Sequence, residues 1–206
     1  MPFTQLRCRE LTCGDILLKI SDGGAISRAI SLGQRLVGQL NPQVVHAGVM
    51  FDSTYVIEAQ GAGVMAHDLR VQNKQFGYLV HRARNGAIAN GAGTFAKILF
   101  DVHQRGGNLK YTMAGAVGSL FSSSRGAATP AEMDRRLDAI LAGRSHPYFC
   151  SQLVVMVYQF AAEQNGISGG TLFPFADPKV SPSALAGHLS QSGQFEERGY
   201  LLPGER

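Results

Sequence analysis

The chain has 206 residues, of which 45% are hydrophobic and 17% charged, a balance typical of a folded globular protein and not of a disordered one. Its net charge of +4 is mild and its basic residues are scattered, so the sequence gives little support to nucleic-acid binding. No apolar run is long enough to span a bilayer, and the first residues lack the charged-then-apolar pattern of a signal segment.

We expect one domain covering residues 1–206, because a chain of this length can bury a sizeable core and no linker-like segment divides it. Without a signal segment, the protein is expected to stay in the cytoplasm or to leave it through a secretion system that reads no N-terminal signal. Stable insertion into a membrane is not expected. The sequence identifies no partner that would deliver or neutralise an exported protein.

The three cysteines, Cys8, Cys13 and Cys150, cannot form a closed set of disulfides, which suits a reducing compartment. Cys8 and Cys13 have no second pair of ligands at a matching spacing. Ordinary packing near the first strand is therefore a better interpretation than a zinc site. Neither a metal nor a cofactor is expected.

Apolar and β-branched runs predict the strands. The first run predicts a buried strand, and the next four predict an antiparallel meander with short turns, one of them at Asp52-Ser53. The predicted strands cover residues 16–20, 44–51, 54–59, 64–69 and 78–82.

Helical spacing of apolar residues and capping signals predict the helices. Thr94 is the expected cap of one helix, after a glycine- and alanine-rich stretch that lacks the Gly-Lys-Ser/Thr of a phosphate-binding loop. The serine-rich stretch 122–128 is expected to be a loop. The predicted helices cover residues 26–37, 94–104, 111–121, 130–142, 150–163 and 181–185.

One of these helices carries a cysteine in its first turn. Pro147 disfavours helical geometry at the residue before it, so the helix is expected to begin just beyond and to place Cys150 near its start. The helix is apolar almost all round, which is typical of a buried helix. Its remaining polar stripe consists of Gln152, Gln159 and Glu163. Free N–H groups and the helix dipole favour a thiolate there, so Cys150 is a candidate nucleophile; the alternative is a small buried hydrophobic residue.

Six histidines are available to act as a base, and His46 stands out because it interrupts an otherwise apolar strand. If the chain turns at Asp52-Ser53, His46 and Glu58 lie nearly opposite each other on paired strands, with both side chains on one face. The carboxylate would then orient the imidazole, and Cys150 would complete a Cys/His/acid set for nucleophilic catalysis. Taken singly, His46 is interpreted as a core histidine and Glu58 as a solvent-facing residue.

Four short motifs follow one another along the chain: Gly14-Asp15-Ile16-Leu17, His46-Ala47-Gly48-Val49, Glu58-Ala59 and Tyr148-Phe149-Cys150-Ser151-Gln152-Leu153-Val154. Their order and spacing resemble the circularly permuted branch of the NlpC/P60 papain-like superfamily. YiiX/YebB-like proteins and, more distantly, lecithin retinol acyltransferase-like proteins belong to that branch. In it the histidine strand precedes the cysteine helix, as here, and the resemblance covers most of the chain.

The resemblance implies an α+β, papain-like fold in which a central antiparallel sheet carrying His46 and Glu58 packs against the Cys150 helix. It implies Cys150 as nucleophile, His46 as general base and Glu58 as the third polar residue. The residues expected to contact substrate are Tyr148, Phe149, Gln152 and Tyr111. Gln152 departs from the pattern of the branch, in which an acidic residue is expected two positions after the cysteine.

These features predict a cysteine hydrolase that cleaves an amide bond, with peptides of the bacterial cell wall as the best-supported substrate. Three alternatives stay open: a lipid or thioester acyl hydrolase or acyltransferase, a secreted effector that modifies a protein amide, and a catalytically silent binding module. The intact Cys/His/acid set counts against the last. Apolar groove walls formed by Phe149, Phe173 and Phe175 would favour a lipid, and a polar cleft would favour a peptide.

Overall fold

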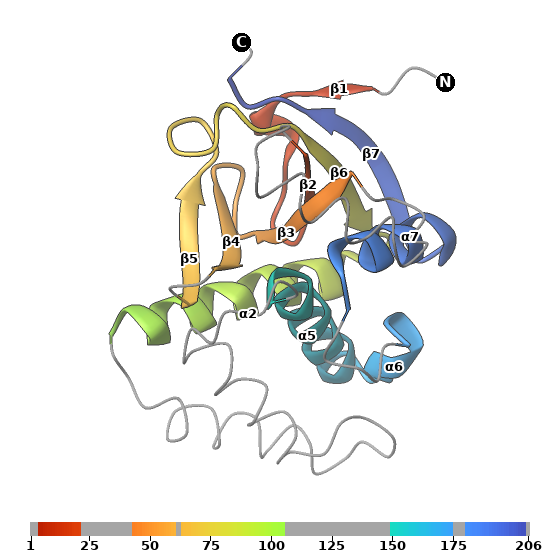
Figure 1. Cartoon of the computed structure of the whole chain (residues 1–206). Helices are drawn as coiled ribbons and strands as arrows, with labels where there is room; N and C mark the ends of the chain where they lie inside the picture. The colour runs from red at the N-terminus through yellow and green to blue at the C-terminus, as the bar shows by residue number, and fades with distance from the viewer. Residues whose placement is uncertain (1–3, 22–42, 61–62, 106–148, 175–179, 205–206) are drawn as a thin grey trace.

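The computed structural model describes residues 4–21, 43–60, 63–105, 149–174 and 180–204. The described residues form an α+β arrangement in which a seven-stranded sheet lies against helices (Figure 1). The predicted helices at 26–37, 111–121 and 130–142 lie outside the described residues, as does the predicted loop at 122–128.

The sheet has the strand order β1-β7-β6-β2-β3-β4-β5. Its strands are β1 (Gln5–Leu6), β2 (Ile16–Ile20), β3 (Val44–Met50), β4 (Tyr55–Gln60), β5 (Gly63–Asp68), β6 (Tyr78–Ala83) and β7 (Phe195–Leu201). Every neighbouring pair is antiparallel except β1 and β7, which are parallel. The expected antiparallel sheet is therefore mixed at this one edge.

The predicted meander is correct from β3 to β5 and wrong at β6. β6 does not continue from β5 but pairs with the other edge of β2. The reason lies in β2, whose residues Ile16, Leu17 and Leu18 are fully buried, so both edges and both faces of this strand need neighbours. The connection 69–77 is longer than a hairpin turn and lets the chain cross to that edge.

β7 was not predicted from the sequence. Its residues Glu196, Glu197 and Arg198 are partly or fully exposed, and Gly199 interrupts the strand with a φ of 137°. Only Phe195 and Leu201 carry the apolar signal, at its two ends. This polar strand pairs with the edge of β6 that faces away from β2.

Helix α2 (Gly86–Gln104) begins well before the predicted start at Thr94. Asn85 is its cap, because the Asn85 side chain accepts hydrogen bonds from the N–H groups of Ala87 and Ile88. The glycines that suggested a loop serve close packing instead. A Cβ added to Gly93 would lie 2.6 Å from the Met50 carbonyl oxygen, so glycine lets the helix lie directly on the sheet.

Helix α5 (Phe149–Gln164) carries the cysteine and confirms the predicted helix, including its buried apolar faces. It packs against α2, where the rings of Phe95 and Phe160 stack with centroids 4.3 Å apart. Two residues of the predicted polar stripe hold the next segment, α6 (Gly169–Leu172). Gln159 donates to the Phe173 carbonyl oxygen, and Glu163 accepts from the Gly169 N–H group.

A last helix, α7 (Pro182–Gln191), covers the predicted segment 181–185 and continues beyond it. Ser181 caps it by accepting a hydrogen bond from the N–H of Ala184. The helix packs on β3 and β7, and the Ser181–Val180 segment before it lies against the start of α5.

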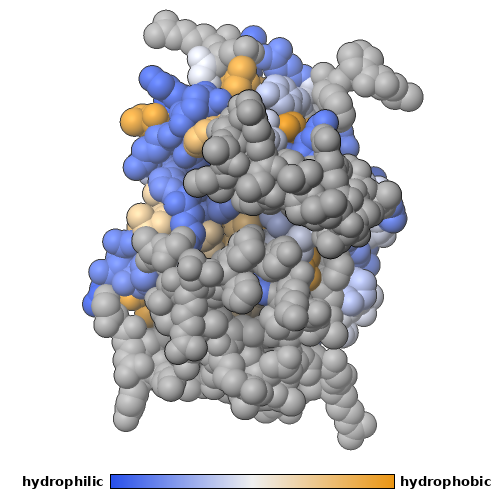
Figure 2. All heavy atoms as spheres, viewed as in Figure 1, coloured by the Kyte–Doolittle hydropathy of each residue, from blue (hydrophilic) through white to orange (hydrophobic). Residues whose placement is uncertain are grey.

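Among the described residues, no helix is long and apolar enough to cross a membrane. The described surface in Figure 2 is mainly hydrophilic, with hydrophobic residues in separate spots. In the described part of the chain, the large hydrophobic residues that are exposed are Tyr55, Val71 and Ile98.

Candidate active site

Cys150 lies in the first turn of α5 and is 3% exposed. Two hydrogen bonds hold this helix in place, one from its first turn and one from its third turn. The Ser151 hydroxyl donates to the Val180 carbonyl oxygen, and the Tyr158 hydroxyl donates to the carbonyl oxygen of Gly14, just before β2. The first turn of the helix is therefore held against the centre of the sheet, where β3 carries His46.

The thiol of Cys150 and the imidazole of His46 lie close enough for each to shift the pKa of the other. Burial raises the pKa of the Cys150 thiol, but the charge and side chain of His46 and the N–H groups of Ala47 and Ser151 outweigh burial, so the pKa is lowered. Burial likewise lowers the pKa of His46, but Cys150 and Glu58 outweigh it, so the pKa is raised well above its usual value. Both shifts favour a thiolate paired with an imidazolium.

Glu58 lies on the same face of the sheet as His46, but not nearly opposite it as predicted. Glu58 pairs with Gly48, so His46 is its diagonal neighbour. Asp52 accepts hydrogen bonds from the N–H groups of Thr54 and Tyr55, and the loop is longer by one residue than the predicted Asp52-Ser53 turn, which moves Glu58 one position further from His46. A separation of two residues along β3 keeps the side chains on one face.

Gly48 explains how the carboxylate reaches its place. A Cβ added to Gly48 would lie 2.6 Å from Val56 Cγ2 and 2.9 Å from Glu58 Cγ. A larger residue would therefore displace the side chain of Glu58 from the face of β3. The glycine of the His-Ala-Gly motif has a steric role beside the histidine.

Glu58 is 2% exposed and has three polar neighbours. Its Oε1 atom lies 3.7 Å from Nε2 of His46, which is an ion-pair distance and longer than a hydrogen bond. Its Oε2 atom is 2.9 Å from Nδ1 of His67 and accepts a hydrogen bond of 3.1 Å from Gln60. Burial raises the pKa of Glu58, but His46 and then His67 outweigh burial and hold the pKa well below its usual range.

The two nitrogens of His46 have different neighbours. Nε2 is buried, faces Glu58 and has no hydrogen-bond partner among the described residues. Nδ1 is therefore the ring nitrogen that is available to the Cys150 thiol. Thiol, imidazole and carboxylate thus form a row, with the imidazole between the other two.

The four residues expected to contact substrate are less well placed by the structure. Gln152 is half-buried on α5, two residues after the cysteine, and Phe149 is the first residue of that helix. Tyr111 and Tyr148 lie outside the described residues. Substrate contacts by these four residues remain predictions.

Phe173 does not fit the expected role of a groove wall. Its ring is fully buried in the core, where it meets Tyr158, Phe195 and His188. The feature that would have favoured a lipid is thus absent at this position, and Phe175 lies outside the described residues.

The other two cysteines differ from Cys150. Cys8 and Cys13 are free and partly exposed, and burial raises the pKa of both thiols. The described part of the chain contains no group of three His, Cys, Asp or Glu side chains that could hold a metal ion.

His67 and Gln60 were missed by reasoning from the sequence. The signal was available, because β4 and β5 are paired antiparallel strands and alternation along β5 places His67 on the face that carries Glu58. His67 was passed over because it lies near the end of its strand, beside Asp68, whereas His46 has apolar neighbours on both sides.

Comparisons with family models, with curated proteins and with solved structures find no match for this chain. The function is therefore argued from the site itself.

Proposed function

We propose that the protein is a cysteine hydrolase that cleaves an amide bond, with Cys150 as nucleophile, His46 as general base and acid, and Glu58 orienting His46. The observation that carries the proposal is the pairing of Cys150 with His46, in which the pKa of the thiol is lowered and that of the imidazole is raised. The two residues lie far apart in the sequence, yet the thiol and the imidazole lie close enough for each to shift the pKa of the other. Such a pair is the activated nucleophile of thiol hydrolases.

The chemistry follows from the order thiol, imidazole, carboxylate. The thiolate of Cys150 attacks the carbonyl carbon of the amide, and the oxyanion that forms is stabilised by N–H groups at the start of α5. The imidazolium of His46 donates its proton to the leaving amine, and a thioester remains on Cys150. His46 then takes a proton from water, the hydroxide attacks the thioester, and the carboxylic acid leaves as the thiol pair is restored.

Glu58 contributes by staying charged. An anion beside Nε2 stabilises the imidazolium and keeps the ring turned so that Nδ1 faces the sulfur. A neutral residue in this place would leave the ring free to rotate.

The substrate class is proposed from the resemblance to the permuted NlpC/P60 branch, which also underlies the proposed papain-like fold and the single domain. Peptides of the bacterial cell wall supply extended amide substrates, and the mild positive charge of the chain suits an anionic envelope.

Purified protein incubated with peptidoglycan tests the proposal through the release of new amino groups. We expect release by the wild type, loss of it in Cys150→Ala, and its retention in Cys13→Ala, which removes a free thiol of raised pKa. A phospholipid panel treated in parallel separates the competing chemistry. Fatty acid or lysolipid without new amines would replace the amide with an ester as the substrate, and Cys150-independent release would contradict the proposal altogether.

A further inference from the structure

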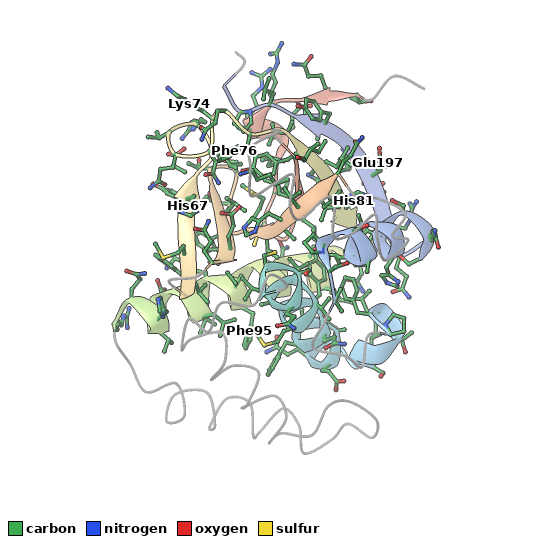
Figure 3. All side chains as sticks on the ribbon, in the orientation of Figure 1. His67, Lys74, Phe76, His81, Phe95 and Glu197 are labelled. Carbon is green, nitrogen blue, oxygen red and sulfur yellow. The ribbon has the colours of Figure 1, made fainter. Side chains whose placement is uncertain are left out.

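Glu58 is held by two histidines, and only one of them has a part in the chemistry proposed above. Oε1 of Glu58 faces His46, whereas Oε2 is 2.9 Å from Nδ1 of His67. The side chain of His67 is 16% exposed, so the contact is largely shielded from water. Figure 3 shows His67 on β5, beside β4.

The sheet explains why the two oxygens meet different rings. Glu58 pairs with Gly48 on one side and with Met65 on the other. His46 lies two residues before Gly48, and His67 lies two residues after Met65. Since β3 and β5 run in the same direction, the two histidines lie diagonally on opposite sides of the carboxylate.

An ionised carboxylate can only accept hydrogen bonds, so the proton in the contact with His67 is carried by Nδ1 of His67. The same oxygen accepts from Gln60, which is exposed on the surface. On the β3 side, the Glu58 side chain lies directly against Gly48. With Oε2 held by His67 and the side chain confined by β3, Oε1 is left facing His46.

We propose that His67 is a positioning residue, which fixes the carboxylate of Glu58 so that Oε1 stays directed at His46. The inference rests on the proposed function, since it assigns His67 a role in keeping His46 protonated beside the Cys150 thiolate. His67 contacts neither the sulfur nor the scissile bond in this scheme and acts through Glu58.

The titratable groups around Glu58 come from four elements among the described residues: His46 from β3, His67 from β5, Tyr78 from β6 and Cys150, through His46, from α5. Burial raises the pKa of Tyr78 far above its usual range, so this phenol stays neutral. Tyr78 therefore does not contribute to changes in the ionisation of the thiol–imidazole pair, which depend on the histidines and Glu58.

His67→Leu keeps the bulk of the side chain and removes the donor. Glu58 is then free to turn away, the imidazolium of His46 loses its steady anionic neighbour, and the pKa of His46 falls. We expect the alkaline limb of the pH profile of kcat/KM to move to lower pH, with a loss of about tenfold at its optimum. His67→Asn places an amide nitrogen near the position of Nδ1 and should restore both the limb and the rate.

The ionisation can be measured without a substrate, from the ultraviolet absorbance of the Cys150 thiolate against pH, with each variant compared with its own Cys150→Ser partner. Gln60→Ala is the matched control, since water can replace an exposed amide on the same oxygen. The thiolate–imidazolium pair is present over a certain range of pH. We expect the upper end of this pH range to fall in His67→Leu, and the range to stay as in the wild type in His67→Asn and Gln60→Ala.

The outcomes separate the two proposals. A wild-type protein without a His46-dependent thiolate would defeat the proposed function. If the wild type forms the pair and His67→Leu keeps it over the same range of pH, the proposed role of His67 is wrong and the proposed function stands. If His67→Leu fails to fold, nitrogen NMR of the wild-type histidines decides: a proton on Nδ1 of His67 that is lost in Glu58→Gln supports the inference, and a proton on Nε2 overturns it.

Discussion

A buried carboxylate stays charged only where its neighbours supply positive charge or hydrogen-bond donors. Glu58 has such neighbours on both oxygens, and His46 depends in turn on that charge. The properties of the thiol of Cys150 are therefore set partly by residues that do not touch it.

Replacing the two partners of the thiol should have unequal effects. His46→Ala removes the acid and base and should lower turnover on the order of 10²–10⁴-fold. Glu58→Gln keeps the shape, removes the charge, and should cost less, about 10–100-fold, because the carboxylate orients the base without taking the proton. Steady-state kinetics on the same substrate compare them. Wild-type activity in Glu58→Gln would show that another acid serves His46.

His81 on β6 gives a prediction for stability against pH (Figure 3). It is 1% exposed, and neither ring nitrogen has a hydrogen-bond partner among the described residues. Burial lowers the pKa of His81 to about 4, whereas an unfolded chain has a histidine pKa of about 6.5. The neutral ring stabilises the fold fully above the unfolded value, and this contribution is lost as pH falls from there through the folded value.

The loss should approach about 3 kcal/mol by the acid end of this window, because each pKa unit corresponds to about 1.4 kcal/mol. Urea unfolding of wild type and His81→Leu at several pH values measures it. The difference between their free energies of unfolding should change between about pH 6.5 and pH 4, and a constant difference would contradict the assignment.

At the scale of elements, the sequence predicted what hydrophobic pattern and capping chemistry encode. β2 to β5, the helix of Cys150 and the segment of α7 were predicted with their main residues, because each has a strong apolar period or a clear cap. β7 was not predicted because charged residues occupy its middle. The pairing of β6 was not predicted because strand order depends on contacts between residues that are distant in sequence.

The candidate site was predicted in part for the same reason. Cys150, His46 and Glu58 have local signals, and parity along two paired strands put the last two on one face. The register between them differed from the prediction because the loop is one residue longer than expected, a length that depends on the hydrogen bonds of Asp52, which the sequence pattern did not specify. His67 lies beside Asp68 near the end of its strand and was missed.

The start of α2 offers a direct test at this scale. Asn85→Ala removes the acceptor of two N–H groups and should lower the free energy of unfolding by about 1 kcal/mol. Thr94→Ala, at the residue predicted to be the cap, lies inside the helix and should change it by less than about 0.5 kcal/mol. Denaturant unfolding of both variants ranks them, and the reverse order would contradict the observed helix start.

For the whole molecule, the buried Asp15 joins elements that are distant in sequence. It is fully buried, and Arg82 of β6 donates to both of its oxygens at 2.6 and 2.7 Å. Thr12 adds a backbone hydrogen bond of 2.8 Å. Gly14, directly before this aspartate, accepts from Tyr158, so one short segment anchors both β6 and α5.

Removing the arginine should leave an uncompensated buried charge. Arg82→Leu is expected to lower the free energy of unfolding by about 3–5 kcal/mol. Arg84→Leu breaks an exposed pair with Glu196 and should cost no more than about 1 kcal/mol. Adding Asp15→Asn to Arg82→Leu should recover part of the loss. Equal costs for the two arginine variants would show that the ion pair does not hold β6.

The separation of Cys150 from His46 and Glu58 along the chain also matters while the protein is being made. A ribosome releases β3, β4 and β5 long before α5, so the histidine–carboxylate half of the site exists first without a nucleophile. Until α5 emerges and docks, the nascent chain can contain no thiolate–imidazolium pair. The proposed activity would therefore arise only in molecules whose synthesis has passed α5, and fragments that end before α5 would lack it.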